Sequence, residues 1–257
     1  MGTSGIYKGQ SDSSPLLPDW LEDELGGDNE ENKLERINSW QNTKKLMSQF
    51  VTGSNRNLGG MTKAYVGAHG GSKRAAQTAI SGKSTAISLG TFLSEVNRNG
   101  LKETLLNYGI EYEDKPLLNV LSDLGNQIAP AGALKEDDIA RKALFACLED
   151  LFDIIDDQNN DIGDIEQLKR EYLEYVMESY IARYVFERLL NDLEYSIEKY
   201  GKDASMIEKE IKDYVYGKIH NELSKYNITQ MNYQSQEIQG NVQKIFEACY
   251  RVLEETL

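Results

Sequence analysis

The sequence predicts an all-α protein, a helical bundle preceded by an extended N-terminal tail that is disordered when free. Three observations support this fold class. Through most of the chain, apolar residues recur at spacings of three and four, which is the period of an amphipathic helix. No segment alternates apolar and polar residues convincingly, as a half-buried strand would. The chain of 257 residues contains only four prolines, and none interrupts the longer periodic segments.

Composition divides the chain into three regions. Residues 1–35 are a flexible N-terminal tail and acidic linker with a docking segment. Residues 36–110 are a basic helical region rich in glycine and alanine, and residues 111–257 are an acidic helical bundle. We therefore expect the folded part to begin near residue 36.

The basic region is expected to hold helices joined by glycine-rich turns. Small alanine side chains, such as those of Ala64, Ala68, Ala75 and Ala76, allow helix backbones to approach closely. The apolar spacing after Gly71 predicts one continuous helix that ends before Asn99-Gly100. The helices predicted in this part and just after it are 37–51, 72–97, 102–108 and 116–128.

The acidic half is more plainly helical. Its longest periodic segment begins near Asp164, and additional Tyr and Met residues widen its apolar stripe. A wide stripe indicates contacts on more than one side, so this helix should be among the most buried elements. The helices predicted here are 139–155, 164–200, 204–223 and 235–255.

The formal net charge of −14 conceals a strong asymmetry. Residues 36–102 contain ten basic residues and one acid, whereas residues 1–35 and 103–257 are both acidic. This basic segment could face nucleic acid, a phosphorylated ligand, the acidic half of the chain or an acidic partner. The overall negative charge slows the approach to nucleic acid, which favours the two protein-facing interpretations. The residues of a possible basic patch are Lys63, Lys73, Arg74 and Lys83.

Other features indicate a cytoplasmic protein without membrane contact. The N-terminus lacks a signal-peptide pattern, and no apolar run approaches the roughly 20 residues of a membrane span. N-myristoylation requires Ser or Thr at the sixth position, where this chain has Ile6. Cys147 and Cys249 both fall within helical apolar patterns, so we expect reduced, buried thiols.

No catalytic constellation emerges from the sequence. Residues 81–85 read Ser-Gly-Lys-Ser-Thr, like the end of a phosphate-binding loop, but Gln77 stands where the first glycine is required. His69 and His220 have no cysteine or carboxylate at ligand spacing, so both are interpreted as structural or surface residues. We expect a protein that is not an enzyme and has no metal and no cofactor; an enzyme acting through clustered carboxylates is the alternative.

The N-terminal tail is interpreted as a segment presented to a partner. Gly2 is small enough for Met1 to be removed, which leaves a glycine α-amine whose pKa of about 7.7–8.0 makes a sizeable fraction nucleophilic near neutral pH. A short apolar segment then interrupts the polar arm and indicates a docking peptide. An ordinary disordered terminus is the alternative. The predicted partner-binding residues are Gly2, Thr3, Ser4, Pro15, Leu16, Leu17, Pro18 and Trp20.

Three stretches carry a family resemblance. They are the opening Met-Gly-Thr-Ser, the segment Ser-Pro-Leu-Leu-Pro-Asp-Trp at 14–20, and Gly-Gly-Ser-Lys-Arg-Ala-Ala at 70–76. An acidic linker separates the second stretch from the third, and an acidic helical half follows the third. With its features in this order, the chain resembles the QatB family. That family is a component of the four-gene bacterial anti-phage cassette QatABCD.

The resemblance implies a role in defence and no known activity of its own. The cassette includes an ATPase (QatA), a QueC-like enzyme (QatC) and a TatD-like nuclease (QatD). QueC-like enzymes activate a 7-deazaguanine carboxylate with ATP and condense it with an amine. The resemblance thus implies a chain that binds QatC through its tail and is modified on the Gly2 amine, with QatA and QatD as further candidate partners. The alternative is a nucleic-acid-binding or scaffold adaptor that uses the basic segment 36–102.

Overall fold

The structure is a computed structural model that describes residues 30–113, 115–129, 131–156, 169–200 and 204–255. Every regular element in those ranges is helical and none is a strand, which confirms the predicted all-α class. No helix among them is long and apolar enough to cross a membrane. The elements are α2 (Glu30–Val51), α3 (Leu58–Ala68), α4 (Ser72–Thr78), α5 (Ile80–Asn99), α6 (Leu101–Asn107), α7 (Leu117–Ile128), α8 (Lys135–Asp156), α9 (Arg170–Tyr200), α10 (Ala204–Leu223), the 3-10 helix η2 (Ile228–Gln230) and α11 (Ile238–Glu254).

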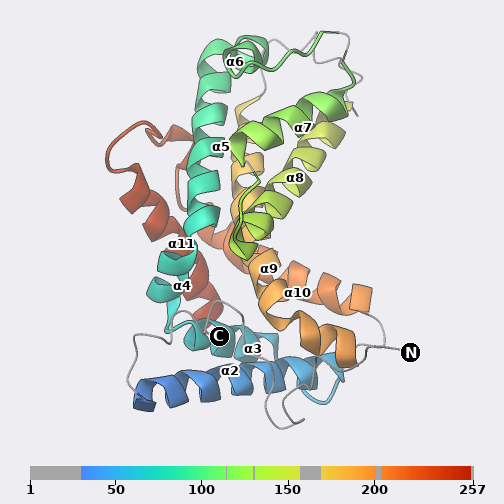
Figure 1. Ribbon diagram of the computed structural model, residues 1–257, viewed down its shortest axis with the longest axis vertical. Helices are drawn as coiled ribbons and strands as arrows, with labels where there is room; N and C mark the ends of the chain where they lie inside the picture. Colours follow the sequence, from blue (N-terminus) through green and yellow to red (C-terminus); the bar gives the residue numbers. More distant parts are fainter. Residues whose placement is uncertain (1–29, 114, 130, 157–168, 201–203, 256–257) are drawn as a thin grey trace, which may run out of the picture.

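The helices form an elongated body with α2 and α3 near one end of its long axis and α6 at the other (Figure 1). α9 packs against α8, α10, α2 and α5, and α11 packs against α3, α4 and α10. The hydrophobic core is one cluster that draws residues from both sides of position 110. This core does not test the predicted division of the chain into three regions, which stays a prediction.

α9 is the element around which this core is built. Leu173, Val176, Tyr180, Tyr184 and Leu189 are each at most 1% exposed. A helix buried on several faces lies inside a bundle rather than on its surface. The prediction that this helix is among the most buried elements is confirmed, while its predicted start near residue 164 lies outside the described residues.

Several helix boundaries differ from prediction. α8 spans Lys135–Asp156 rather than 139–155, and α11 spans Ile238–Glu254 rather than 235–255. Two differences are larger. α2 begins at Glu30, earlier than the predicted 37, because the glutamates of residues 30–35 are good helix formers. The predicted helix 72–97 is two helices, α4 and α5, separated at Ala79, whose ψ of 57° lies outside the helical region. Alanine is the strongest helix former, so local sequence gives no sign of this break. Its cause is tertiary and is described with the site.

α5 approaches its neighbours closely at two glycines. A Cβ at Gly82 would overlap the ring of Tyr184, and a Cβ at Gly90 would overlap the ring of Tyr233. The hydroxyl of Tyr180 also donates to the carbonyl of Gly82 at 3.0 Å. The glycines of α5 are therefore contact points for aromatic rings.

Replacing Gly82 by alanine should destabilise the fold. Because the Tyr184 ring is buried and cannot move aside freely, the added methyl group should lower the free energy of unfolding by about 1–3 kcal/mol. Gly217→Ala is the matched control: Gly217 lies inside α10 with open space around a Cβ, so alanine should raise that free energy by about 0.5–1 kcal/mol. Urea unfolding of both variants measures the two effects, and equal stability of G82A and the parent chain would refute the close approach.

Candidate functional site

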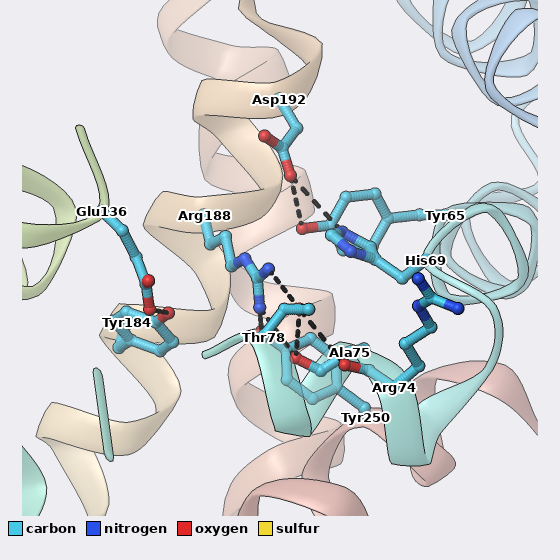
Figure 2. Close-up of polar contacts among 10 residues, drawn as sticks. All are labelled: Tyr65, His69, Arg74, Ala75, Thr78, Glu136, Tyr184, Arg188, Asp192 and Tyr250. Carbon is cyan, nitrogen blue, oxygen red and sulfur yellow. Dashed lines mark hydrogen bonds and ion pairs between the residues drawn. The ribbon is translucent and has the colours of Figure 1, made fainter. Parts of the chain in front are cut away.

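The break between α4 and α5 is stabilised by side chains from other helices (Figure 2). The backbone N–H of Ala79 donates to the carbonyl of Ala76 at 3.3 Å and leaves the Ala75 carbonyl without its helical partner. The Nη1 of Arg188, on α9, donates to that carbonyl at 2.8 Å, and its Nη2 donates to Thr78 Oγ1 at 2.8 Å. Arg188 therefore caps α4 at the end where the helix dipole favours a cation. We call residues 75–83, with the side chains that bond them, the α4–α5 junction.

At the start of α5, a carboxylate caps the helix by accepting a backbone hydrogen bond. Glu136, on α8, accepts at Oε1 from the backbone N–H of Ser81 at 3.0 Å. The same oxygen accepts from the hydroxyl of Tyr184 at 2.7 Å. The hydroxyl of Ser81 donates to Asp137 Oδ1 at 2.6 Å. Because Ala79 cannot cap α5 with its own side chain, α8 supplies acceptors where the dipole favours an anion.

Lys83 is part of the same junction. Its Nζ donates to the carbonyl of Gln77 at 3.1 Å and to the side-chain oxygen of Gln243 on α11. Burial lowers the pKa of Lys83, although Glu136 acts in the opposite direction. The segment 81–85 is thus the first turn of a helix held by its neighbours, which agrees with the prediction that it is not a phosphate-binding loop.

Arg188 is buried, with 4% of its surface exposed. Its Nη1 also donates to the hydroxyl of Tyr250 at 3.2 Å. Burial by itself lowers the pKa of an arginine, but Tyr250, Tyr184, Tyr65 and Asp192 outweigh that effect and raise the pKa of Arg188 well above its ordinary value. The guanidinium is a permanent charge in the core.

A second polar cluster lies one turn further along α9. The hydroxyl of Tyr65 donates to Asp192 Oδ2 at 3.0 Å, and His69 Nε2 lies 3.4 Å from the same oxygen (Figure 2). The ring of Trp40 meets the rings of Tyr65 and His69 edge to face at 5.9 and 5.1 Å. Burial first, and Asp192 second, raise the pKa of Tyr65 well above its ordinary value, so its hydroxyl stays a donor. His69 is a buried structural histidine, one of the two outcomes predicted for it.

The His69–Asp192 pair has the composition of a catalytic base with its orienting acid, yet it is closed to solvent. The two side chains are 0% and 1% exposed, whereas a general base must reach its substrate. Burial also raises the pKa of both thiols, that of Cys147 to about 12, which disfavours the reactive thiolate. No group of three or more metal-binding side chains occurs in the part of the chain that the structure describes. The cluster therefore holds helices together.

A small cleft opens between α5, α9 and η2. Leu93, Leu173 and Met177 are among the residues of its wall, and Asn97 and Arg170 lie at its rim. Its volume of about 50 Å³ has room for a few water molecules. Small-molecule sites usually have volumes of roughly 300–1,000 Å³, so this cleft is too small for an ordinary cofactor.

The predicted site residues differ in burial and bonding, and some lie outside the described residues. Lys63, Lys73 and Arg74 are exposed, whereas Lys83 is half-buried and bonded in the junction. Lys83 thus differs from the other three residues of the possible basic patch in being half-buried and bonded within the fold. Whether those three bind a partner stays a prediction. The predicted tail residues, from Gly2 to Trp20, lie outside the described residues.

Sequence reasoning missed the residues that build the junction. Arg188 and Asp192 lie on α9 in phase with buried Val185 and Leu189, so charged residues occupy positions of the apolar stripe. A charge at a core position is costly unless it is paired. That mismatch was the available signal for a buried polar network, although it does not identify the partners.

Comparison with known proteins adds one finding. A family model for QatB, described as Qat anti-phage system associated protein QatB, matches residues 70–253. The matched segment is well over half of the chain and contains the whole α4–α5 junction. No curated protein and no solved structure gives a match.

Replacing Arg188 by methionine should strongly destabilise the fold. The substitution removes the charged donor of the buried Ala75 carbonyl, which keeps only the Thr78 hydroxyl at 3.2 Å. The free energy of unfolding should therefore fall by about 1–3 kcal/mol. Arg183→Met is the control, because Arg183 lies on the same helix and is bonded to Asp150 but is less buried; its loss should be about 1 kcal/mol. Urea unfolding gives both values, and a loss for R188M no larger than that for R183M would contradict the capping role.

Proposed function

Because this chain belongs to the QatB family and is a component of the Qat anti-phage defence system, we propose that it acts there as a non-enzymatic partner of the QueC-like enzyme QatC. It binds that enzyme through its N-terminal tail and is modified on the Gly2 amine with a 7-deazaguanine. The observation that carries this proposal is the combination of family membership with a Met-Gly terminus on an arm that contains an apolar docking segment.

The docking segment supports binding in an extended form. It contains Leu16, Leu17 and Trp20 between acidic and polar residues, and Pro15 and Pro18 restrict its backbone. A restricted peptide loses less conformational entropy when it binds. Leucine and tryptophan side chains can then fill pockets of the partner, where a buried Trp is frequently an energetic hot spot.

The chemistry at Gly2 needs no catalytic group from this chain. After removal of Met1, the neutral α-amine attacks the acyl carbon of the ATP-activated deazaguanine acid held by the partner enzyme. The new amide C–N bond forms as the bond to the AMP leaving group breaks, and the amine gives up one proton. Glycine has no side chain to hinder the bulky acyl adenylate, and Thr3 and Ser4 can assist through hydrogen bonds and small size.

The arrangement of the helical body supports a non-enzymatic role. Its most polar interior region, the α4–α5 junction with the Tyr65–Asp192 cluster, consists of side chains that bond one another and the ends of helices. A group that is committed to caps and packing is poorly placed to bind a substrate. We infer that the body is a rigid carrier for the tail and for partner surfaces.

A nucleic-acid-binding or scaffold adaptor is the second candidate. The exposed positions of Lys63, Lys73 and Arg74 favour it. Binding to nucleic acid would weaken steeply as salt is raised, because phosphate contacts release counterions. Binding to QatC through the tail would depend on apolar side chains instead.

Replacing Gly2 by leucine should abolish modification. A bulky second residue blocks removal of Met1 and hinders the adenylate, so intact-mass analysis of the chain co-expressed with its cassette should show no added mass. The parent chain should show an increase located on its N-terminal peptide and dependent on QatC. Gly5→Leu, the same change further along the arm, should leave the increase in place. An unmodified Gly2 in a cassette that still protects cells would exclude the substrate role.

Replacing both Leu17 and Trp20 by alanine should weaken the complex with QatC by at least about tenfold, or about 1.4 kcal/mol. The two side chains are, with that of Leu16, the apolar anchors of the docking segment. Titration calorimetry with purified partners measures the change, and the double variant Ser11→Ala/Ser13→Ala is the control in the same arm. Unchanged affinity of the L17A/W20A chain would remove the docking role.

A further inference from the structure

The basic residues of segment 36–102 are of two kinds in the structure. Some are used inside the fold: Lys83 bonds within the α4–α5 junction, Arg56 pairs with Glu210, and Lys44 is buried. Others are exposed on the surface. The fold itself therefore accounts for only part of this positive charge.

Two exposed lysines lie near the C-terminal end of α11. Thr62, next to Lys63, donates to the carbonyl of Leu253 at 3.1 Å. The backbone N–H of Ser72, next to Lys73, donates to Glu254 at 3.3 Å. Neither lysine has an acidic partner among the residues that the structure describes. With the exposed Arg74 they form what we call the basic face: Lys63, Lys73 and Arg74.

The acidic linker that precedes α2 is the natural ligand for this face. Residues 19–29 contain five acids (Asp19, Glu22, Asp23, Glu24 and Asp28) and no base. The linker joins the body at Glu30, the first residue of α2, and α2 packs along α3. A run of 11 residues spans up to roughly 36–40 Å when extended, and a helix of 22 residues is about 33 Å long. The linker is thus long enough to run back along the whole of α2.

We propose that the acidic linker, residues 19–29, binds in cis to the basic face formed by Lys63, Lys73 and Arg74. Each exposed ion pair is weak by itself, at roughly 0.2–1 kcal/mol. The tether raises the effective concentration of the linker to about the millimolar range, so several weak pairs suffice. Such an interaction is released by salt, because exposed charges are screened.

This interaction would regulate how the tail is presented. A bound linker keeps residues 1–18 close to the α3–α4 end of the body, and a partner that binds the docking segment must compete with it. It would also shield the basic face from nucleic acid, since a phosphate backbone would have to displace a tethered polyanion. The inference does not depend on modification of Gly2.

Carbodiimide cross-linking of the full chain tests the contact directly, because the reagent joins a carboxylate to a lysine amine only when they touch. Equal amounts of ¹⁵N-labelled and unlabelled protein distinguish links within one molecule from links between two. In about 20 mM salt we expect links from residues 19–28 to Lys63 and Lys73 within one molecule, and at least about fivefold fewer in about 500 mM salt. Links found only between labelled and unlabelled chains would assign the face to a second copy and overturn the proposal.

Charge reversal gives an independent readout. The variant Lys63→Glu/Lys73→Glu should release the linker, so a glutamate-specific protease should cleave it at least about threefold faster in low salt. Arg98→Glu/Lys102→Glu is the matched control, since both residues belong to the same basic segment but lie at the α5–α6 end of the molecule (Figure 1). The reversed lysines are exposed, so thermal unfolding should be nearly unchanged.

Two further results would refute binding in cis. One is equal cleavage of the linker in the two double variants and the parent chain. The other is binding of a fluorescent single-stranded oligonucleotide that requires Lys63 and Lys73 while cross-links to the linker are absent, which would assign the face to nucleic acid.

Discussion

The buried guanidinium of Arg188 is the interaction on which the structure depends. At Ala79 the chain leaves the helical conformation, and the carbonyl of Ala75 then faces the core without its backbone donor. A buried carbonyl without a partner costs free energy, and so does a buried cation. Arg188 resolves both by donating to Ala75 and to Thr78, with Tyr250 as a further acceptor. Arg188 thus ties the end of α4 to α9, while α4 itself packs against α11.

Glu136 complements Arg188 on the other side of the break. The Arg188 cation caps the C-terminal end of α4, and the Glu136 carboxylate caps the N-terminal end of α5. Each charge therefore faces the helix terminus whose dipole favours it. Both come from helices distant in sequence, α9 and α8, and the junction can form only when these are assembled. The QatB family match, residues 70–253, spans all of these elements. Family membership and the junction thus belong to the same part of the chain.

Periodicity was sufficient to predict most of the helices. α10 has the predicted bounds, 204–223, because its apolar residues keep the helical phase from end to end. The break at Ala79 could not be predicted, since it depends on a contact with Arg188 that lies more than 100 residues away in sequence. For the candidate site, the sequence indicated that Ser-Gly-Lys-Ser-Thr is not a phosphate-binding loop. It did not predict that Lys83 bonds to Gln243. The tail predictions lie outside the described residues and depend on chemistry rather than on packing.

In this account, the helical body is a carrier and the N-terminal tail is the working part of the protein. The most direct measurement is the intact mass of an unrelated helical protein that carries residues 1–35 at its N-terminus and is co-expressed with QatC and its cassette. The account predicts that the QatC-dependent mass increase appears on the first peptide of this fusion. An unmodified fusion beside a modified parent chain would contradict it, because the body would then be required for recognition.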